Sequence, residues 1–194
     1  MVRHNPTEGP KTMILSDVEI ADRIKSKSLI ISPVPEPYCL QPASVDVTLG
    51  TDFRIYPKQQ LGLHIEPATS HFKTDEFELA PGQFVLGTTK EFVRMPNDLA
   101  GDLAGRSSLG RMGLLVHATA GYVDPGFSGT ITLELKNIND NCPIVLRAGM
   151  RIGQLVLYLL TSPCANPYGS AKLRSKYQDN SGTFPYRAEI DKKL

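Results

Sequence analysis

Ile131-Thr-Leu-Glu-Leu-Lys136 alternates apolar and polar side chains without a break. In an extended strand, successive side chains point to opposite faces, so the isoleucine and both leucines would share one face. Thr132, Glu134 and Lys136 would share the other. The segment therefore predicts an amphipathic strand with one face on a hydrophobic core. An acid in the middle of a strand is unfavourable unless it is exposed, paired or useful, and taken alone the pattern favours a simply exposed Glu134.

Further strands are expected before and after this segment. Ser44–Leu49 alternates and ends at Gly50, and Gln83–Val93 follows a Pro81-Gly82 turn. Ile152–Leu160 is more continuously apolar, which predicts a strand buried on both faces. The 15 prolines and 16 glycines are spread along the chain, as expected for short strands joined by turns. The fold class expected is mainly β, in the form of a distorted β-barrel or jelly roll.

The two ends of the chain depart from this β pattern. Ser16 and Glu19 have the spacing of a capping box, so one helix is expected near 16–27, packed on the barrel and without a chemical role. The last part of the chain is rich in Gly, Ser, Asn and basic residues, and is expected to become an ordered lid only when a ligand or a neighbour holds it. The chain is thus expected to divide into a flexible extension over 1–12, a barrel domain over 13–161 and a tail over 162–194.

The composition limits the partners and the compartment. The chain has 194 residues, 41% hydrophobic and 21% charged, as in one ordinary globular domain. Its 21 basic and 20 acidic residues nearly cancel, so neither a nucleic-acid nor a membrane partner is expected. No apolar run approaches the roughly 20 residues of a membrane span, and no signal peptide is visible. Cys39, Cys142 and Cys164 are far apart, which argues against a disulfide framework and favours a reducing cytoplasm.

Gly105-Arg-Ser-Ser-Leu-Gly-Arg111 has the residue types of an anion site. A glycine followed by small hydroxyl residues can expose consecutive backbone N–H groups, and the flanking arginines Arg106 and Arg111 add charged donors suited to phosphate oxygens. The alternative is a polar turn with solvated arginines, and for this segment alone that alternative is favoured.

His117 to Phe127 forms a second cluster. Asp124 precedes Pro-Gly and is flanked by Tyr122 and Phe127, so it could hold a sugar hydroxyl against a ring. The alternative is a tight turn in which Asp124 caps local amides. His117 is interpreted as a core histidine and is given no catalytic role.

Two familiar nucleotide motifs are incomplete or missing. His64-Ile-Glu66 spells the H-x-E of zinc deaminases, but the P-C-x-x-C that must follow is absent, since Pro163-Cys164 is followed by Ala-Asn-Pro. The zinc interpretation therefore fails. The chain also has no G-x-x-x-x-G-K-[ST] loop, which argues against a kinase of that type. A deaminase built from this chain would have to activate water without a metal.

Several motifs, taken in order, closely resemble the dCTP deaminase family, a branch of the dUTPase-like superfamily with the β-clip fold. They are GRSSLGR at 105–111, HATAGYVDPGFSGTITLEL at 117–135, AGMRIGQL at 148–155, PYGS at 167–170 and SKYQ at 175–178. The resemblance extends from Met13-Ile-Leu-Ser-Asp17 through QPASVDVTLG at 41–50 to FPYR at 184–187. The GRSS segment also fits trimeric dUTPases, whereas the GYVDPGFSGTITLEL run at 121–135, which contains Glu134, is more specific to the deaminase branch.

The resemblance implies a homotrimer of distorted barrels, with each active site at a subunit boundary and dCTP or dUTP as substrate. Glu134 would be the general acid/base, Ser107 and the backbone at Ala120 would orient the water, and Arg111 would keep Glu134 placed and charged. Mg²⁺ would be bound through the triphosphate, with no metal held by protein side chains and no zinc. The residues implied to bind the nucleotide are Arg106, Ser107, Ser108, Leu109, Gly110, Arg111, Asp124, Thr132, Leu133, Glu134, Gln154, Tyr168, Lys176 and Asn180.

Within that set, the resemblance assigns particular contacts. Arg106 to Ser108 would hold the triphosphate, with Arg111 and Lys176 nearby. Asp124 would meet the deoxyribose 3′-hydroxyl, and the main chain at 132–134 would read the edge of the base. Gln154, Tyr168 and residues 176–180 would close over the nucleotide.

Gly121-Tyr122 bears on how far the reaction proceeds. Members of the family that continue to dUMP and pyrophosphate resemble this chain in having a glycine and an aromatic here, and the glycine would leave room for a second water to approach the α-phosphorus. Formation of dUMP is therefore expected. The alternatives are a monofunctional deaminase that releases dUTP, a plain dUTPase, a nucleotide-binding protein without activity and a purely structural subunit.

The tail departs from the family pattern. Bifunctional relatives usually have K-Y-Q-G-Q, whereas this chain has Lys176-Tyr-Gln-Asp-Asn180. Asn180 is one methylene shorter than the glutamine, and Asp179 adds negative charge near the phosphates. Closure of the lid is the property that this difference affects.

Overall fold

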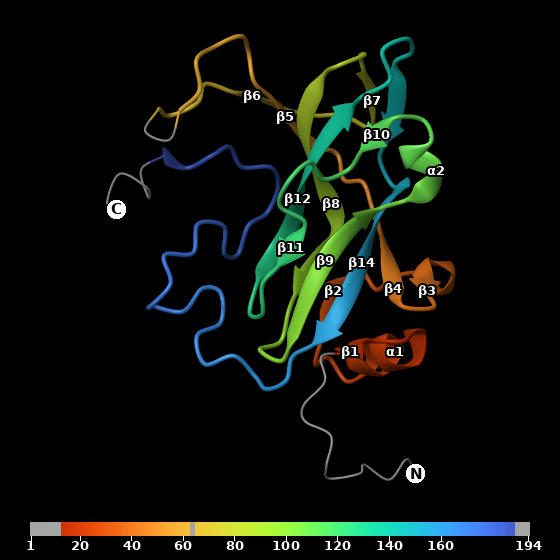
Figure 1. Ribbon diagram of the computed structural model, residues 1–194, viewed down its shortest axis with the longest axis vertical. Helices are drawn as coiled ribbons and strands as arrows, with labels where there is room; N and C mark the ends of the chain where they lie inside the picture. Colours follow the sequence, from red (N-terminus) through yellow and green to blue (C-terminus); the bar gives the residue numbers. More distant parts are fainter. Residues whose placement is uncertain (1–12, 63–64, 189–194) are drawn as a thin grey trace.

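The computed structural model describes residues 13–62 and 65–188 and is mainly β (Figure 1). The expected extension over 1–12 and His64 lie outside the described residues. In chain order the elements are β1 Met13–Ile14, α1 Asp17–Lys25, β2 Ile30–Ser32, a 3₁₀ turn Pro37–Cys39, β3 Leu40–Gln41, β4 Ser44–Thr48, β5 Asp52–Ile55, β6 Ser70–Lys73, β7 Glu76–Leu79, β8 Phe84–Arg94, β9 Leu99–Gly105, α2 Ser107–Gly110, β10 Leu114–Leu115, β11 Tyr122–Val123, β12 Ser128–Asn137, β13 Ile144–Arg147 and β14 Arg151–Leu159.

Two six-stranded antiparallel sheets form the body of the molecule. The first has the order β11-β9-β14-β4-β3, with β1 added to β14. The second has the order β10-β12-β8-β5-β6, with β2 added to β8, and β13 pairs with β7 separately. Both orders are open paths, so within the described ranges the expected barrel takes the form of two packed sheets, as in a jelly roll, and not of a closed cylinder. The mainly β fold predicted from the sequence is confirmed.

The strand β12 has the two faces that its sequence predicts. Its three apolar residues Ile131, Leu133 and Leu135 are at most 6% exposed, whereas Thr132 and Glu134 are half-buried. The apolar face joins one core with buried residues of the first sheet, among them valines of β4 and leucines of β14. Because side chains alternate along a strand, this burial directs the threonines and Glu134 away from the core.

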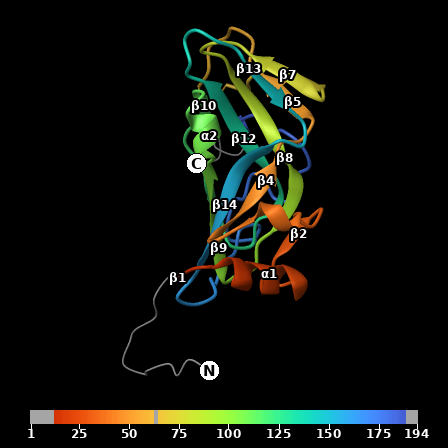
Figure 2. The ribbon, with the colours of Figure 1, turned by 90° about the vertical axis from the view of Figure 1, so that its right-hand side faces the viewer.

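The helix α1 lies across one end of both sheets (Figure 2). It starts after Ser16, whose hydroxyl accepts from Glu19 N at 3.5 Å as the capping box predicts, and it buries Ile20 completely. The helix is thus confirmed within two residues of its expected bounds. Among the described residues, no helix is long and apolar enough to cross a membrane.

The burial of strand β14 differs from the prediction. It lies between β9 and β4 in the first sheet, and Leu155 and Leu157 are fully buried on one face. Val156 and Tyr158, on the other face, are only half-buried. The prediction of burial on both faces is therefore wrong, because the continuous apolar run reflects a central position in the sheet and not a layer on each side.

A β-bulge in β12 lies just before Glu134. The register with β8 shifts between Thr130 and Thr132, and Ile131 N donates to Thr89 Oγ1 at 3.0 Å. The threonine hydroxyl thus satisfies a buried amide that the irregular ladder leaves unpaired. Bulges re-aim side chains and are common beside functional sites.

A buried carboxylate joins the two sheets. Glu91 of β8 is 5% exposed and accepts two hydrogen bonds from Thr48 of β4, at 2.8 Å from the amide and 2.6 Å from the hydroxyl. Two donors on one carboxylate offset much of the cost of burying it. This contact fixes the spacing between the sheets at one point.

Two valines provide a test of the core. Val47 is fully buried in β4, whereas Val18 on α1 is 66% exposed. We expect Val47→Ala to lower the free energy of unfolding by about 2 kcal/mol, because it removes buried apolar surface and leaves a cavity. Val18→Ala should change it by less than about 0.5 kcal/mol. Urea unfolding measures both, and equal effects of the two changes would contradict the assignment of Val47 to the core.

Candidate active site

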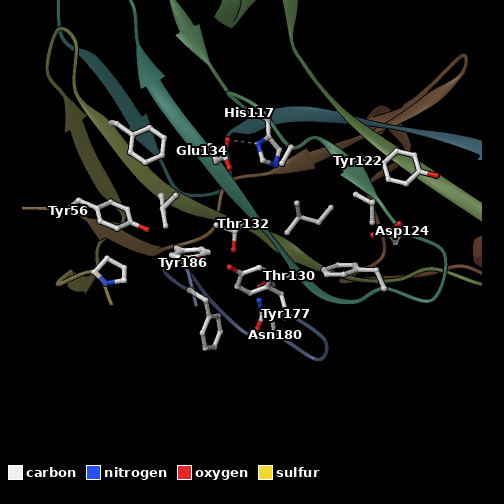
Figure 3. A pocket seen from close by; sticks show the side chains of 18 of the residues that line it. Tyr56, His117, Tyr122, Asp124, Thr130, Thr132, Glu134, Tyr177, Asn180 and Tyr186 are labelled. Carbon is white, nitrogen blue, oxygen red and sulfur yellow. Dashed lines mark ion pairs between the residues drawn. The ribbon is translucent and has the colours of Figure 1, made fainter. Parts of the chain in front are cut away.

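A cavity of about 840 Å³ opens beside the polar face of β12. Thr130, Thr132 and Glu134 line it from that strand, as Figure 3 shows. The loop before and within β11 lines one side, from His117 to Asp124, and the C-terminal tail lines another. Cavities that enclose small molecules commonly have volumes of roughly 300–1,000 Å³.

Glu134 lies in the cavity wall beside two residues of the preceding loop. Its Oε2 accepts from Thr119 N at 3.1 Å and from Thr119 Oγ1 at 3.0 Å. His117 Nδ1 lies 3.4 Å from the same oxygen (Figure 3), within ion-pair distance when the imidazole carries a proton. The Glu134 side chain is 25% exposed, so it remains accessible from the cavity.

These neighbours hold Glu134 in its charged form. His117 makes the largest contribution to lowering the pKa of Glu134, and the hydroxyl and amide of Thr119 lower it further. Partial burial acts in the opposite direction and is outweighed. Glu134 is therefore an ionised carboxylate at neutral pH, ready to accept a proton.

His117 is the functional neighbour that the sequence interpretation missed. It was expected to be a satisfied core histidine, but Nδ1 is buried and has no hydrogen-bond partner among the described residues. The histidine side chain is 9% exposed and lines the cavity. Nothing in the order of residues marks its closeness to Glu134, since the two belong to different segments brought together by the fold.

Asp124 lies apart from Glu134 across the cavity, on the side of Tyr122 (Figure 3). It is exposed, and partial burial raises the pKa of its carboxyl. No described residue donates a hydrogen bond to its side chain. The alternative interpretation, in which Asp124 caps the amides of a tight turn, is therefore not supported. The rings of Phe127 and Tyr168, 6.0 Å apart, form an aromatic wall beside it.

The tail supplies the remaining wall. Tyr177, Asn180 and Tyr186 line the cavity (Figure 3), and Asn180 is only 5% exposed. Asp179 has φ +57°, in the left-handed region that favours glycine and that Asp tolerates better than most residues. The departure from the family pattern noted in the sequence thus falls on a strained backbone position. Lys176 places its ammonium 5.1 Å from the Tyr186 ring centroid.

The segment around α2 lies elsewhere in the same chain. Residues 106–111 do not line the cavity, and Ser107 and Ser108 are exposed. Arg106 lies against the buried Asp46, with Nε 3.6 Å from Oδ2. Gln154 also lies apart from the cavity, 3.4 Å from Ser44 Oγ. Within one chain, the predicted phosphate-binding residues and the predicted acid/base residue remain separate.

Gly121 is packed tightly against β9. A Cβ at this position would lie 2.9 Å from Asp102 Oδ1 and 3.0 Å from the carbonyl oxygen of Leu103, and Leu103 N donates to Gly121 O at 2.8 Å. The close approach of β9 therefore favours a glycine here, in addition to the space for a second water that the sequence analysis suggested. Tyr122 is 60% exposed and lines the cavity.

The predicted site residues thus fall into two groups. The cavity brings together Ala120, Tyr122, Asp124, Thr132, Glu134, Tyr168 and Asn180. It is not lined by Arg106, Ser107, Ser108, Leu109, Gly110, Arg111, Gly121, Leu133, Gln154 or Lys176. Leu133 faces the core and has no exposed surface, so only its main chain could meet a ligand.

The carboxylates of the cavity bear on metal binding. Asp124 and Glu134 lie apart and do not converge on one point (Figure 3). In residues 13–62 and 65–188, no group of three or more His, Cys, Asp and Glu side chains could hold a metal ion.

A profile of the family described as dCTP deaminase-like matches residues 14–160. The chain belongs to the dCTP deaminase-like family. The family predicted from the sequence is confirmed. A member from Mycolicibacterium smegmatis named dCTP deaminase, dUMP-forming is 48% identical over 92% of this chain and 98% of its own length. A protein of the same name from Nocardia farcinica is 48% identical over 92% of this chain and 93% of its own length.

A solved member has the same fold. The crystal structure of a 2′-deoxycytidine 5′-triphosphate deaminase from Agrobacterium tumefaciens matches with a TM-score of 0.62 and 21% sequence identity. The match covers 76% of this chain and 48% of that chain. At this identity the likeness concerns the fold, and it agrees with the two-sheet architecture described above.

The contact between His117 and Glu134 predicts a shift in titration. We expect His117→Asn to raise the pKa of Glu134, because the group with the largest lowering effect is removed. The carboxyl ¹³C shift of Glu134, assigned with Glu134→Gln and followed against pH in the free protein, measures it. His71→Asn is the matched control and should leave the titration unchanged. A Glu134 pKa that stays the same in His117→Asn would refute the electrostatic role of His117.

Proposed function

We propose that this chain removes the 4-amino group of dCTP by metal-independent attack of water at C4, and then hydrolyses the product to dUMP and pyrophosphate. The observation that carries the proposal is Glu134, an ionised carboxylate facing a cavity of nucleotide size. The names of the relatives, dCTP deaminase, dUMP-forming, support the same two-step reaction.

Glu134 would act first as a base and then as an acid. Its carboxylate would take a proton from water as the water oxygen bonds to C4. The protonated Glu134 would then give that proton to the amino nitrogen, the C4–N bond would break and ammonia would leave. Transfer of the remaining hydroxyl proton from O4 to N3 would give dUTP. Proton transfer by a positioned side chain typically contributes about 10²–10⁴-fold to a rate. The carboxylate is ionised at neutral pH, as the first role requires, and its lowered pKa makes it a weaker base than an ordinary glutamate.

The cavity suggests how the nucleotide would lie. The cytosine would sit over Thr132 to Glu134, whose main chain would read the base edge, with Ala120 beside the attacking water. Asp124, which lies apart from Glu134, would accept from the deoxyribose 3′-hydroxyl. Tyr168 and Asn180 line the cavity on the tail side and would cover the sugar and phosphates.

The separation of α2 from the cavity supports an active site shared between subunits. We propose a homotrimer in which residues 106–111 of one subunit complete the cavity of the next. Arg106, Ser107 and Ser108 would bind the triphosphate, Ser107 would also orient the water, and Arg111 would hold Glu134. The backbone of Leu109 and Gly110, with Gln154 and Lys176, would complete the phosphate contacts.

The second step would split dUTP between the α- and β-phosphates. A second water would attack the α-phosphorus and pyrophosphate would leave. We assign Gly121 and Tyr122 to this step, and the dUMP-forming names of the relatives support it. The close fit of Gly121 against β9 would keep the loop clear of the phosphate.

Mg²⁺ would accompany the triphosphate and neutralise part of its charge, held by phosphate oxygens and water rather than by a set of protein carboxylates. Zinc has no part in this proposal. The chain carries three cysteines, all unpaired, which supports a reducing compartment such as the cytoplasm.

We propose that the body of the fold is the domain over 13–161 and that the tail from 162 onward acts as a lid. The tail contacts the start of β12 at Ser128 and Thr130, and four of its residues beyond position 176 line the cavity, namely Tyr177, Asn180, Phe184 and Tyr186. A lid of this kind would exclude water other than the reacting molecule.

Replacement of Glu134 tests the chemistry. We expect Glu134→Gln to lower ammonia release from dCTP by at least about 10²-fold, because the amide cannot accept the proton, while dCTP still binds. An ammonia assay and product analysis measure this, with Glu78→Gln on β7 as a control that should retain the wild-type rate. A Glu134→Gln rate within a few-fold of wild type would exclude the acid/base role.

Wild-type products separate the alternatives. We expect dUMP and pyrophosphate with little free dUTP. Accumulation of dUTP would indicate a monofunctional deaminase. Pyrophosphate formed from dUTP, without ammonia from dCTP, would indicate a plain dUTPase, and binding without turnover would indicate a regulatory protein.

Mixed trimers test the shared site. Arg111→Ala and Glu134→Gln should each be inactive alone. If subunits mix at random, about one quarter of the sites in co-expressed trimers combine an intact Glu134 with an intact Arg111 from the neighbour. We therefore expect about one quarter of wild-type activity per site. Activity no greater than the sum of the two variants would place both residues in a single-chain site and contradict the shared arrangement.

A further inference from the structure

Thr183 in the tail is held by two residues of β5. Its amide and its hydroxyl both donate to Asp52 Oδ1, the amide at 2.9 Å. Its carbonyl oxygen accepts from Arg54, at 3.3 Å from Nε and 3.0 Å from Nη2. All three polar groups of Thr183 are thus bound, and the residue is only 3% exposed.

The residues just before Thr183 are bound to β12. The carbonyl of Asn180 accepts from Thr130 N at 3.0 Å, and Gly182 N donates to Thr130 Oγ1 at 3.0 Å. Gly182 has φ +97°, and a Cβ on it would lie 3.0 Å from Asp52 Oδ2. The backbone angle at this position favours glycine, and the tail packs closely against the Asp52 carboxylate.

These contacts fix the part of the tail that lies between the cavity-lining residues. Tyr177 and Asn180 line the cavity just before Thr183, and Phe184 and Tyr186 line it just after. Asp52 itself does not line the cavity, and the reaction proposed above does not use it. A displacement of Thr183 would move tail residues on both sides of it.

We propose that Asp52 is a positioning residue for the reaction: with Arg54 it clamps Thr183 and so holds the tail wall of the cavity closed over the nucleotide. We call Asp52, Arg54 and Thr183 the tail clamp. The inference deepens the proposed function, on which its kinetic readout rests.

The charge of Asp52 gives the clamp its strength. Burial acts to raise the pKa of Asp52, but the hydroxyl and amide of Thr183 and the contact of His71 with Oδ2, at 2.7 Å, together lower it. The carboxylate therefore accepts these bonds in its charged form. Hydrogen bonds to charged groups are stronger than those between neutral groups, and a buried donor left unpaired is costly.

Two changes to the clamp test the proposal. Asp52→Ala removes the acceptor, and Thr183→Val removes one donor without changing the shape of the side chain. We expect Asp52→Ala to raise the KM for dCTP about tenfold, with a smaller change in kcat, and Thr183→Val to act in the same direction more weakly. Thr183→Ser restores the hydroxyl and should return KM to near the wild-type value. Glu76→Ala, which removes an exposed carboxylate paired with Arg147, is the matched control and should leave KM unchanged.

A second readout does not depend on activity. Trypsin can cut the tail after Lys172, Arg174 and Lys176, and we expect cleavage of the folded protein without nucleotide to be about tenfold faster in Asp52→Ala, as the tail opens more often. Melting temperatures show that each variant is folded. Cleavage and KM both unchanged in Asp52→Ala would overturn the proposal, as would loss of kcat alone at constant KM, the signature of general destabilisation. If the wild type releases no ammonia from dCTP, the proposed function fails, and the cleavage rates still decide the clamp.

Discussion

The alternation of side chains along β12 is the constraint on which the site depends. Three apolar residues of this strand are locked into the core, and a shift of one residue against β8 would expose all of them while burying Glu134. Such a shift is costly, so the Glu134 side chain is held on the face of the sheet that lies away from the core. The core thereby fixes the position of a charged group that takes no part in its packing, and the bulge before Glu134 adjusts the threonines that share its face.

Three carboxylates of this fold are each bound by a threonine from another segment of the chain. Glu91 is bound by Thr48, Asp52 by Thr183 and Glu134 by Thr119, and in each pair one threonine supplies both its amide and its hydroxyl. The first pair joins the two sheets, the second joins the tail to β5 and the third joins the loop to β12. The same contact, a carboxylate bound by the amide and hydroxyl of one threonine, therefore joins the sheets, holds the tail and positions Glu134.

Sequence patterns predicted those helices and strands that are determined by a few consecutive residues. The period of β12 and the capping box of α1 are contained in a few consecutive residues, and both elements were found where expected. Contacts between distant segments were not predictable in this way: His117 lies beside Glu134, and Asp52 binds Thr183, because the sheets and the tail bring them together. The motif around Arg106 was recognised, but its distance from Glu134 within one chain depends on the fold and could not be read from the order of residues.

Asp179 shows how one unusual backbone angle affects the cost of ordering the tail. An aspartate in the left-handed region is less comfortable than a glycine would be, which disfavours the packed conformation slightly. In the unpacked chain, however, a glycine samples many more conformations than an aspartate, and all but one are lost on packing. The aspartate makes the unpacked tail stiffer, so the tail loses less conformational entropy when it packs. This smaller entropy loss cancels part of the steric penalty of the left-handed backbone angle.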